Sequence, residues 1–114
     1  MAGRRRVLWI DITGRDPAAS ILDVEPGDAT PALAASWAWH RLTARPRALA
    51  RIYTMRSEWP ATRAAVAKLP PRIRHRVRWW IADPTGYPHL VPGSDATQWF
   101  WGSRYDITTA TPRF

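Results

Sequence analysis

Short apolar runs rich in β-forming residues alternate with segments of helical spacing, and this alternation limits the fold more than any other feature of the chain. Strands are predicted at residues 7–12, 21–25, 49–54, 76–82, 96–101 and 105–108. In the third of these, Ile52 and Thr54 share one face, and Arg51 and Tyr53 share the other. Two helices separate the strands in the middle of the chain. The order β-β-α-β-α-β-β-β predicts an α/β fold with a mostly parallel sheet built by right-handed crossovers.

The two predicted helices have recognisable boundaries. Thr30 is a suitable cap and Pro31 a suitable first residue for a helix that runs to the Arg45-Pro46 break. Within this helix Trp37 is expected in the core, and Trp39, on another face, at the surface or a contact. The second helix is expected from a Ser57 cap to about Leu69, where two prolines stop it.

The length of 114 residues predicts one domain spanning residues 1–114. A complete (β/α)₈ barrel needs roughly 200–250 residues and is excluded. The chain has no cysteine, which excludes disulfides, thiolate catalysis and Cys-ligated metals. His40, His75 and His89 lie far apart without ligand spacing, so no metal or cofactor is expected. No apolar run approaches the roughly 20 residues of a membrane span, and the apolar run after the arginines of the N-terminus is too short for a signal peptide, which predicts a soluble chain.

The formal net charge of +8 comes almost wholly from arginine, because Lys68 is the only lysine. Arginine binds phosphates well, so a nucleic-acid partner is one candidate, although a coding bias toward Arg and Ala explains the same composition. Residues 72–78 alternate arginine with the bulky residues Ile73, His75 and Val77. This segment is either a groove for phosphate or teichoic acid, or a solvated loop that leads into an edge strand.

The scarce acidic residues lie at the predicted C-terminal ends of strands or just past them: Asp11, Asp23, Glu25, Asp83 and Asp106. In a parallel sheet these ends share one rim, where active sites of this class form. The two carboxylates of Asp23-Val24-Glu25 lie on one face, which raises the pKa of at least one of them. One protonated and one ionised acid is the arrangement used for glycoside hydrolysis, whereas the alternative is a pair that caps a helix or faces water.

Tryptophan is far more frequent than usual, with eight residues. Trp9, Trp79, Trp99 and Trp101 share predicted strands with the acids. Aromatic rings beside carboxylates suit sugars, whose C–H faces stack on π surfaces.

Five segments, in order, resemble the strand motifs of glycoside hydrolase family 25 lysozymes and their actinobacterial relatives: Ile21-Leu22-Asp23-Val24-Glu25, Ile52-Tyr53-Thr54 with Trp59, Trp79-Trp80-Ile81-Ala82, Ala96-Thr97-Gln98-Trp99 and Tyr105-Asp106-Ile107. The resemblance covers about residues 21–114, roughly the C-terminal half of a barrel. It implies a partial or truncated (β/α) barrel with about six short strands and two main helices. Bacterial and phage members of this family cleave peptidoglycan without a metal or cofactor.

The resemblance also implies roles for single residues. Glu25 corresponds to the general acid, Asp23 to the carboxylate that assists at the sugar centre, and Asp106 to the acid of the last strand. Asp11 resembles the acid of the family's opening strand, but only about ten residues separate it from the Asp23 strand. Either Asp11 belongs to another strand, or the first half of the barrel is missing. The residues that we expect to contact the glycan are Trp9, Tyr53, Trp79, Asp83, Gln98 and Trp99.

Three functions therefore remain open for this chain. The first is a peptidoglycan hydrolase-like domain, the second a non-catalytic glycan-binding module, and the third an arginine-rich nucleic-acid binder. The edges of so small an open sheet are unpaired and its inner face is apolar, which predicts self-association or association with a missing half-barrel.

Overall fold

The computed structural model describes residues 8–114. The predictions made for the N-terminal arginines and for Val7 lie outside these residues. The chain forms six strands and three helices, in the order β1 (Ile10–Asp11), β2 (Ile21–Val24), α1 (Pro31–Ala44), β3 (Ala50–Met55), α2 (Trp59–Val66), α3 (Pro71–Arg74), β4 (Val77–Ala82), β5 (Ala96–Trp101) and β6 (Asp106–Ala110).

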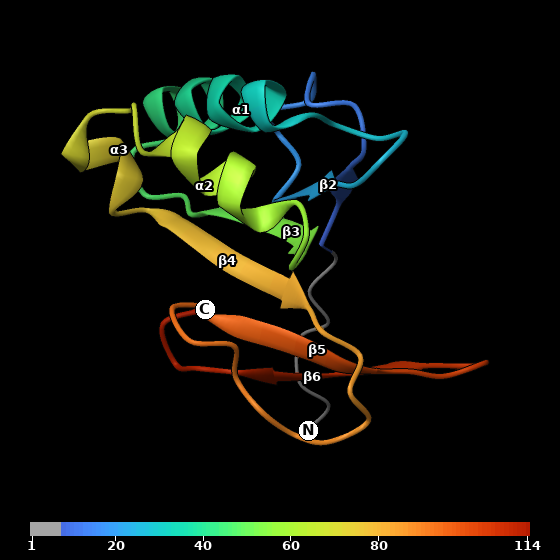
Figure 1. Ribbon diagram of the computed structural model, residues 1–114. Helices are drawn as coiled ribbons and strands as arrows, with labels where there is room; N and C mark the ends of the chain where they lie inside the picture. The colour runs from blue at the N-terminus through green and yellow to red at the C-terminus, as the bar shows by residue number, and fades with distance from the viewer. Residues whose placement is uncertain (1–7) are drawn as a thin grey trace, which may run out of the picture.

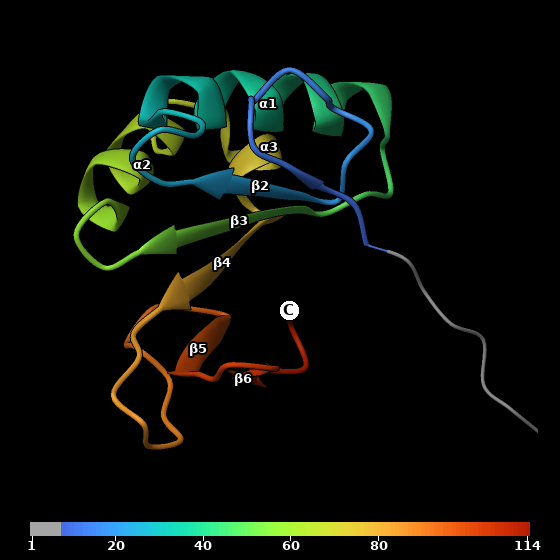
Figure 2. The ribbon, with the colours of Figure 1, turned by 90° about the vertical axis from the view of Figure 1, so that its right-hand side faces the viewer.

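All six strands belong to one sheet, in which their spatial order is the same as their order along the chain. Strands β1 to β5 are parallel, and β6 returns antiparallel to β5. The three helices all cover the same face of this sheet, and the sheet curves from β2 through β4 to the β5–β6 hairpin (Figures 1 and 2). The prediction of a mostly parallel α/β sheet with about six strands is confirmed.

Local sequence signals explain where the helices begin and end. The Oγ1 of Thr30 accepts a hydrogen bond from the Leu33 amide at 3.3 Å, so α1 begins as its cap predicts. Helix α2 begins at Trp59 with Glu58, and not the predicted Ser57, at its N-cap, and it has no side-chain cap and is shorter than predicted. Pro71 begins the additional short helix α3 in a segment predicted as a loop, because proline fits a first helical turn.

The arginine-rich segment leads into β4, which is a central strand and not the edge strand of the sequence prediction. β4 pairs with β3 on one side and with β5 on the other. Its alternation of charge and bulk therefore does not protect an exposed edge. Two of its residues, Val77 and Ile81, are buried on the helix-covered face, and Arg78 lies on the opposite face with partial exposure.

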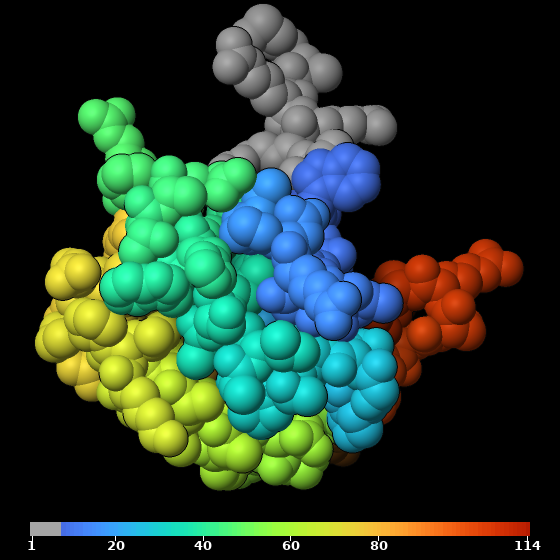
Figure 3. Space-filling model, turned by 90° about the horizontal axis from the view of Figure 1, so that it is seen from above, coloured from blue at the N-terminus to red at the C-terminus, as the bar shows by residue number. Residues whose placement is uncertain are grey.

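The main core lies between the sheet and the helices. Strand β3 shows the predicted alternation, because Ala50, Ile52 and Thr54 are fully buried while the residues between them are partly exposed. Trp37 of α1 is buried as predicted, and Trp39 is a partly buried contact at the edge of the core. Seen from above, the helices cover the sheet and the β5–β6 hairpin projects beyond them (Figure 3).

The C-terminal residues lie against the face that the helices leave uncovered (Figure 2). The ring of Phe114 meets the ring of Trp80 edge-on, with centroids 5.8 Å apart. The Arg51 guanidinium lies 5.1 Å from the centroid of the same Phe114 ring, and its Nε–H donates to the Phe114 carbonyl at 2.9 Å. These contacts lie near the start of β3, so the C-terminal residues shield that part of the helix-free face and leave the rim at the strand ends open.

Strands β1 and β6 form the two edges of the sheet within residues 8–114. Large apolar side chains stay exposed at the β1 edge, namely Leu8, Trp9, Ile10 and Ile12. Self-association through such an edge stays a prediction, which sedimentation at micromolar concentration would test. No helix of the described part of the chain is long and apolar enough to span a membrane.

Candidate active site

Five of the predicted site residues meet in one cleft at the rim of the sheet. The cleft has a volume of about 320 Å³ and is lined by Ile10, Asp23, Glu25, Tyr53, Trp80, Gln98 and Asp106. Tyr53, Trp80 and Gln98 come from the middle of β3, β4 and β5, whereas Glu25 follows the end of β2. Because β6 is antiparallel, its first residue, Asp106, lies at the same rim as the last residues of the parallel strands.

Three carboxylates gather at the end of β2. Asp23, Glu25 and Asp28 each place a carboxylate oxygen within 4.8 Å of the others. A tight turn brings Asp28 back toward the strand: its amide donates to the Glu25 carbonyl at 2.9 Å, and Gly27 adopts a φ of +88°. Asp28 is an additional member of this cluster, and the Pro26-Gly27 dipeptide directly after the strand is the local signal for the turn that places it there.

The environment of Asp23 favours its protonated form. Burial, a hydrogen bond with Glu25 and the negative charges of Glu25 and Asp28 together raise the pKa of Asp23 to about 8. The Asp23–Glu25 pair therefore holds one proton at neutral pH. The raised pKa agrees with the effect that the sequence predicts for two carboxylates on one face of a strand. A metal ion bound to the three carboxylates would have to displace that proton.

A hydrogen-bonded framework fixes the wall of the cleft opposite these acids. The Oε1 of Gln98 accepts hydrogen bonds from the Tyr53 hydroxyl at 2.7 Å and from the Trp101 Nε1–H at 2.6 Å. An indole nitrogen only donates, so the orientation of the Gln98 amide is settled. The Gln98 Nε2 then points toward the Asp106 Oδ2 at 3.4 Å. Burial and the nearby carboxylates raise the pKa of Tyr53, which keeps its hydroxyl protonated.

Trp80, and not the predicted Trp79, faces the cleft. The Trp80 ring meets that of Tyr53 edge-on at 4.9 Å, and its Nε1–H donates to the Thr108 Oγ1 at 3.1 Å. Trp79 lies on the helix-covered face, where its ring is 6.2 Å from that of Trp59. Adjacent residues of a strand point to opposite faces, so the prediction of Trp79 as a cleft residue is wrong by one position.

Asp11 does not line the cleft, although it ends β1 beside β2. Its Oδ1 accepts hydrogen bonds from the Thr13 amide and hydroxyl, both at 2.7 Å, and its Oδ2 accepts one from the Asp16 amide at 2.8 Å. Burial raises the pKa of Asp11, but these hydrogen bonds outweigh it and the net pKa is lowered. The carboxylate therefore closes its own loop.

Three further predicted contacts also lie outside the cleft. Trp9 is 70% exposed at the β1 edge. Asp83 binds the His89 Nε2 at 2.8 Å and the Arg56 guanidinium at 3.3 Å in the loop after β4. The Nε1–H of Trp99 donates to the Thr109 Oγ1 at 3.0 Å, and Trp99 lines a different hollow.

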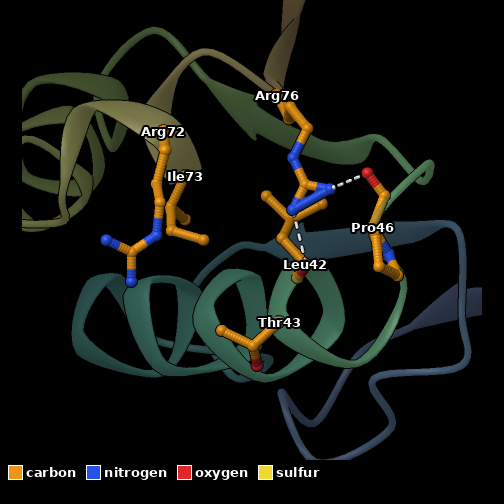
Figure 4. A pocket seen from close by; sticks show the side chains of 6 residues that line it. All are labelled: Leu42, Thr43, Pro46, Arg72, Ile73 and Arg76. Atoms are coloured by element: carbon orange, nitrogen blue, oxygen red, sulfur yellow. Dashed lines mark hydrogen bonds between the residues drawn. The ribbon is translucent and has the colours of Figure 1, made fainter.

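The arginine-rich segment has a local role in the fold. Arg76 lines a hollow between α1 and α3, and its guanidinium donates to the carbonyls of Leu42, Arg45 and Pro46 at the end of α1 (Figure 4). These carbonyls have no partner within a helix that stops there, so Arg76 satisfies them. Arg78 likewise donates to the carbonyls of His75 and Arg113. Both side chains are thus used in holding the backbone.

The resemblance to glycoside hydrolase family 25 lysozymes stays a prediction that depends on the quoted motifs. No family model, curated protein or solved structure matches this chain.

Proposed function

We propose that this chain is a glycan hydrolase-like domain that acts on peptidoglycan or a related polysaccharide through Asp23 and Glu25. The observation that supports this most is the carboxylate pair that holds one proton, at the rim of the sheet, beside a fixed wall of Tyr53 and Gln98. A shared proton supplies an acid and a base in one place at neutral pH. The choice of peptidoglycan rests on the motif resemblance.

In this proposal Glu25 is the general acid. Asp23 passes the shared proton to Glu25 through their hydrogen bond, and Glu25 donates that proton to the glycosidic oxygen while the bond from that oxygen to the sugar carbon breaks. The positive charge that develops on the sugar is stabilised by the carboxylates that line the cleft, Asp106 among them. Water then adds its hydroxyl to the sugar carbon and returns a proton to the pair.

The spacing of the acids limits the mechanism. The oxygens of Asp23 and Glu25 lie within 4.8 Å of each other. Inverting enzymes keep their two carboxyl groups about 6.5–9.5 Å apart, so that a water fits between them. Asp23 therefore acts through Glu25 and does not activate a water on the far side of the sugar.

Clearing of a purified peptidoglycan suspension tests this function. We expect the wild type to clear it and Glu25→Gln to be at least about 100-fold slower, because the amide cannot donate the acid proton. Glu58→Gln, which alters an acid at the start of α2, is the matched control and should clear like the wild type. Equal clearing by wild type and Glu25→Gln, or none by either, contradicts the proposal.

A glycan-binding module without catalysis is the second candidate. It is favoured by the contribution of β1, which places Ile10 in the cleft but turns Asp11 into its own loop. Cosedimentation with peptidoglycan separates the two. Binding without clearing supports the module, whereas binding with clearing that needs Glu25 supports the hydrolase.

A further inference from the structure

A second hollow meets the acidic cleft at Trp101. It has a volume of about 390 Å³ and is lined by Pro84, Thr85, Gly86, Trp99, Phe100 and Trp101. Trp101 joins the two sites, because it lines the hollow while its Nε1–H donates to Gln98, which lines the cleft.

The Trp101 indole is exposed and yet fixed. It is 48% exposed, whereas its hydrogen-bond partner Gln98 is 7% exposed. An exposed aromatic ring normally loses rotamer freedom when a ligand stacks on it, and that loss weakens binding. Because the 2.6 Å hydrogen bond to Gln98 already orients the indole, a ligand here would meet a ring that is already in place.

Backbone contacts hold the other walls of the hollow. The register of β5 against β6 shifts between Gln98 and Phe100, and such a bulge redirects the side chains that follow it. The Gly86 amide donates to the Trp99 carbonyl at 2.8 Å, which holds the turn after β4 against β5. Gly86 has a φ of +83° and no atom within 4 Å of where a Cβ would be, so this wall stays open.

The chemistry of the hollow differs from that of the cleft. The hollow is lined by aromatic, proline, threonine and glycine residues without charge, whereas the cleft holds three carboxylates. A ligand that reaches across Trp101 from one to the other needs a part that carries the reacting bond and a neutral part with an apolar face. A glycan chain has both, because each ring offers C–H groups for stacking and hydroxyls for hydrogen bonds.

We propose that this hollow is a second sugar-ring subsite, in which Trp101 stacks on a ring of the same glycan that occupies the cleft. The nature of the ligand rests on the proposed function, but binding to the subsite does not require cleavage. The test therefore uses Glu25→Gln as the parent protein, so that bound oligosaccharide is not consumed.

Calorimetry with N-acetylglucosamine oligomers measures the subsite. We expect the parent to bind the pentasaccharide more tightly than the disaccharide. Adding Trp101→Ala should weaken pentasaccharide binding about three- to tenfold and leave disaccharide binding within about twofold. Trp101→Phe keeps a ring but loses the N–H that donates to Gln98, so its pentasaccharide affinity should lie between those of the parent and Trp101→Ala. Tyr87→Ala removes an exposed aromatic of the same loop that does not line the hollow, and it should change neither affinity.

The outcomes for the subsite can be told apart from those for hydrolysis. Equal affinities for the two oligomers, no binding of either, or an unchanged pentasaccharide affinity in Trp101→Ala overturns the subsite, even where the wild type clears peptidoglycan. Pentasaccharide binding that depends on Trp101, in a protein whose wild type does not clear peptidoglycan, supports the subsite while hydrolysis fails.

Discussion

The two faces of this sheet come from the same strands but differ in what they do. On β3, Ile52 and Thr54 are fully buried under the helices, while Arg51 and Tyr53 on the other face are partly exposed. On β3 the covered face is apolar apart from the hydroxyl of Thr54, which donates to the Val24 carbonyl at 2.7 Å. The uncovered face carries the acids, amide and aromatic rings of the cleft. Stability and chemistry are thus separated by the two-residue period of a strand.

The largest expected effect comes from truncating the covered face. Ile52→Ala should lower the free energy of unfolding by about 2–5 kcal/mol, because it leaves a cavity among fully buried residues. Tyr53→Phe, the neighbouring change on the uncovered face, loses only the hydroxyl bond to Gln98 and should cost about 1 kcal/mol. Urea denaturation measures both. Similar losses would contradict the separation of the two faces.

A smaller contrast is expected between two arginines that line the hollow between α1 and α3. Arg76→Ala should lower the free energy of unfolding by about 1–2 kcal/mol, because the carbonyls of Leu42, Arg45 and Pro46 lose their donor. Arg72 lines the same hollow but is exposed, so Arg72→Ala should change it by less than about 0.5 kcal/mol (Figure 4). An equal loss in both variants would show that the hollow depends on charge and not on these carbonyls.

The pH dependence of stability sharpens the contrast on the uncovered face. The pKa of Asp23 rises from an ordinary 3.8 to about 8 on folding, so the folded chain keeps a proton that the unfolded chain has lost. The contribution of Asp23 is complete below its ordinary pKa and is lost as pH rises through its folded pKa. The slope is at most about 1.4 kcal/mol per pH unit, and less here because water reaches the cleft.

Asp23→Asn removes this proton linkage. Denaturation at about pH 5 and at about pH 8 should show the wild type losing stability between the two, while the variant loses less. The control is Asp11→Asn, because the pKa of Asp11 is lowered and this group is ionised at both pH values. Parallel losses in wild type and Asp23→Asn would show that Asp23 is already ionised at the lower pH.

Much of the fold followed from local signals in the sequence. The Thr30 cap, the proline stops and the alternation in residues 49–54 each act within a few residues, and the elements they predict are present. The short helix α3 was missed although Pro71 is a local signal for its first turn, and the central position of β4 was missed because it depends on which strand lies beside which. That choice is made by tertiary packing.

The sequence predicted which kinds of residue line the cleft better than it predicted which individual residues reach it. Asp23, Tyr53 and Gln98 lie on neighbouring strands and line one cleft, which Glu25 and Asp106 join at the rim of the sheet. Asp11 and Asp83 also lie at strand ends, but local hydrogen bonds from Thr13 and His89 occupy their carboxylates. Trp101 was named among the tryptophans on strands with the acids but not among the expected glycan contacts, because its role depends on the bulge between Gln98 and Phe100, which no local pattern indicates.

The smallest expected effect lies in the loop after β4, which borders the hollow that Trp101 lines. The His89 Nδ1 lies 2.8 Å from the Tyr87 carbonyl and its Nε2 lies 2.8 Å from the Asp83 Oδ2, so both nitrogens face acceptors and the charged ring fits best. The hydrogen bond to Tyr87, followed by that to Asp83, raises the pKa of His89, while the Arg56 guanidinium opposes the rise.

This arrangement predicts a loop that is held more firmly in acid than in base. The contribution of His89 is complete below its ordinary pKa of 6.5 and is lost as pH rises through its raised folded pKa. Amide hydrogen-exchange protection at Gly86 should therefore fall with rising pH in the wild type and not in His89→Gln. His75→Gln, which alters an exposed histidine before β4, should follow the wild type. A fall in protection that persists in His89→Gln would show that another group holds this turn against β5. That group, and not His89, would then stabilise the wall of the hollow beside Trp101.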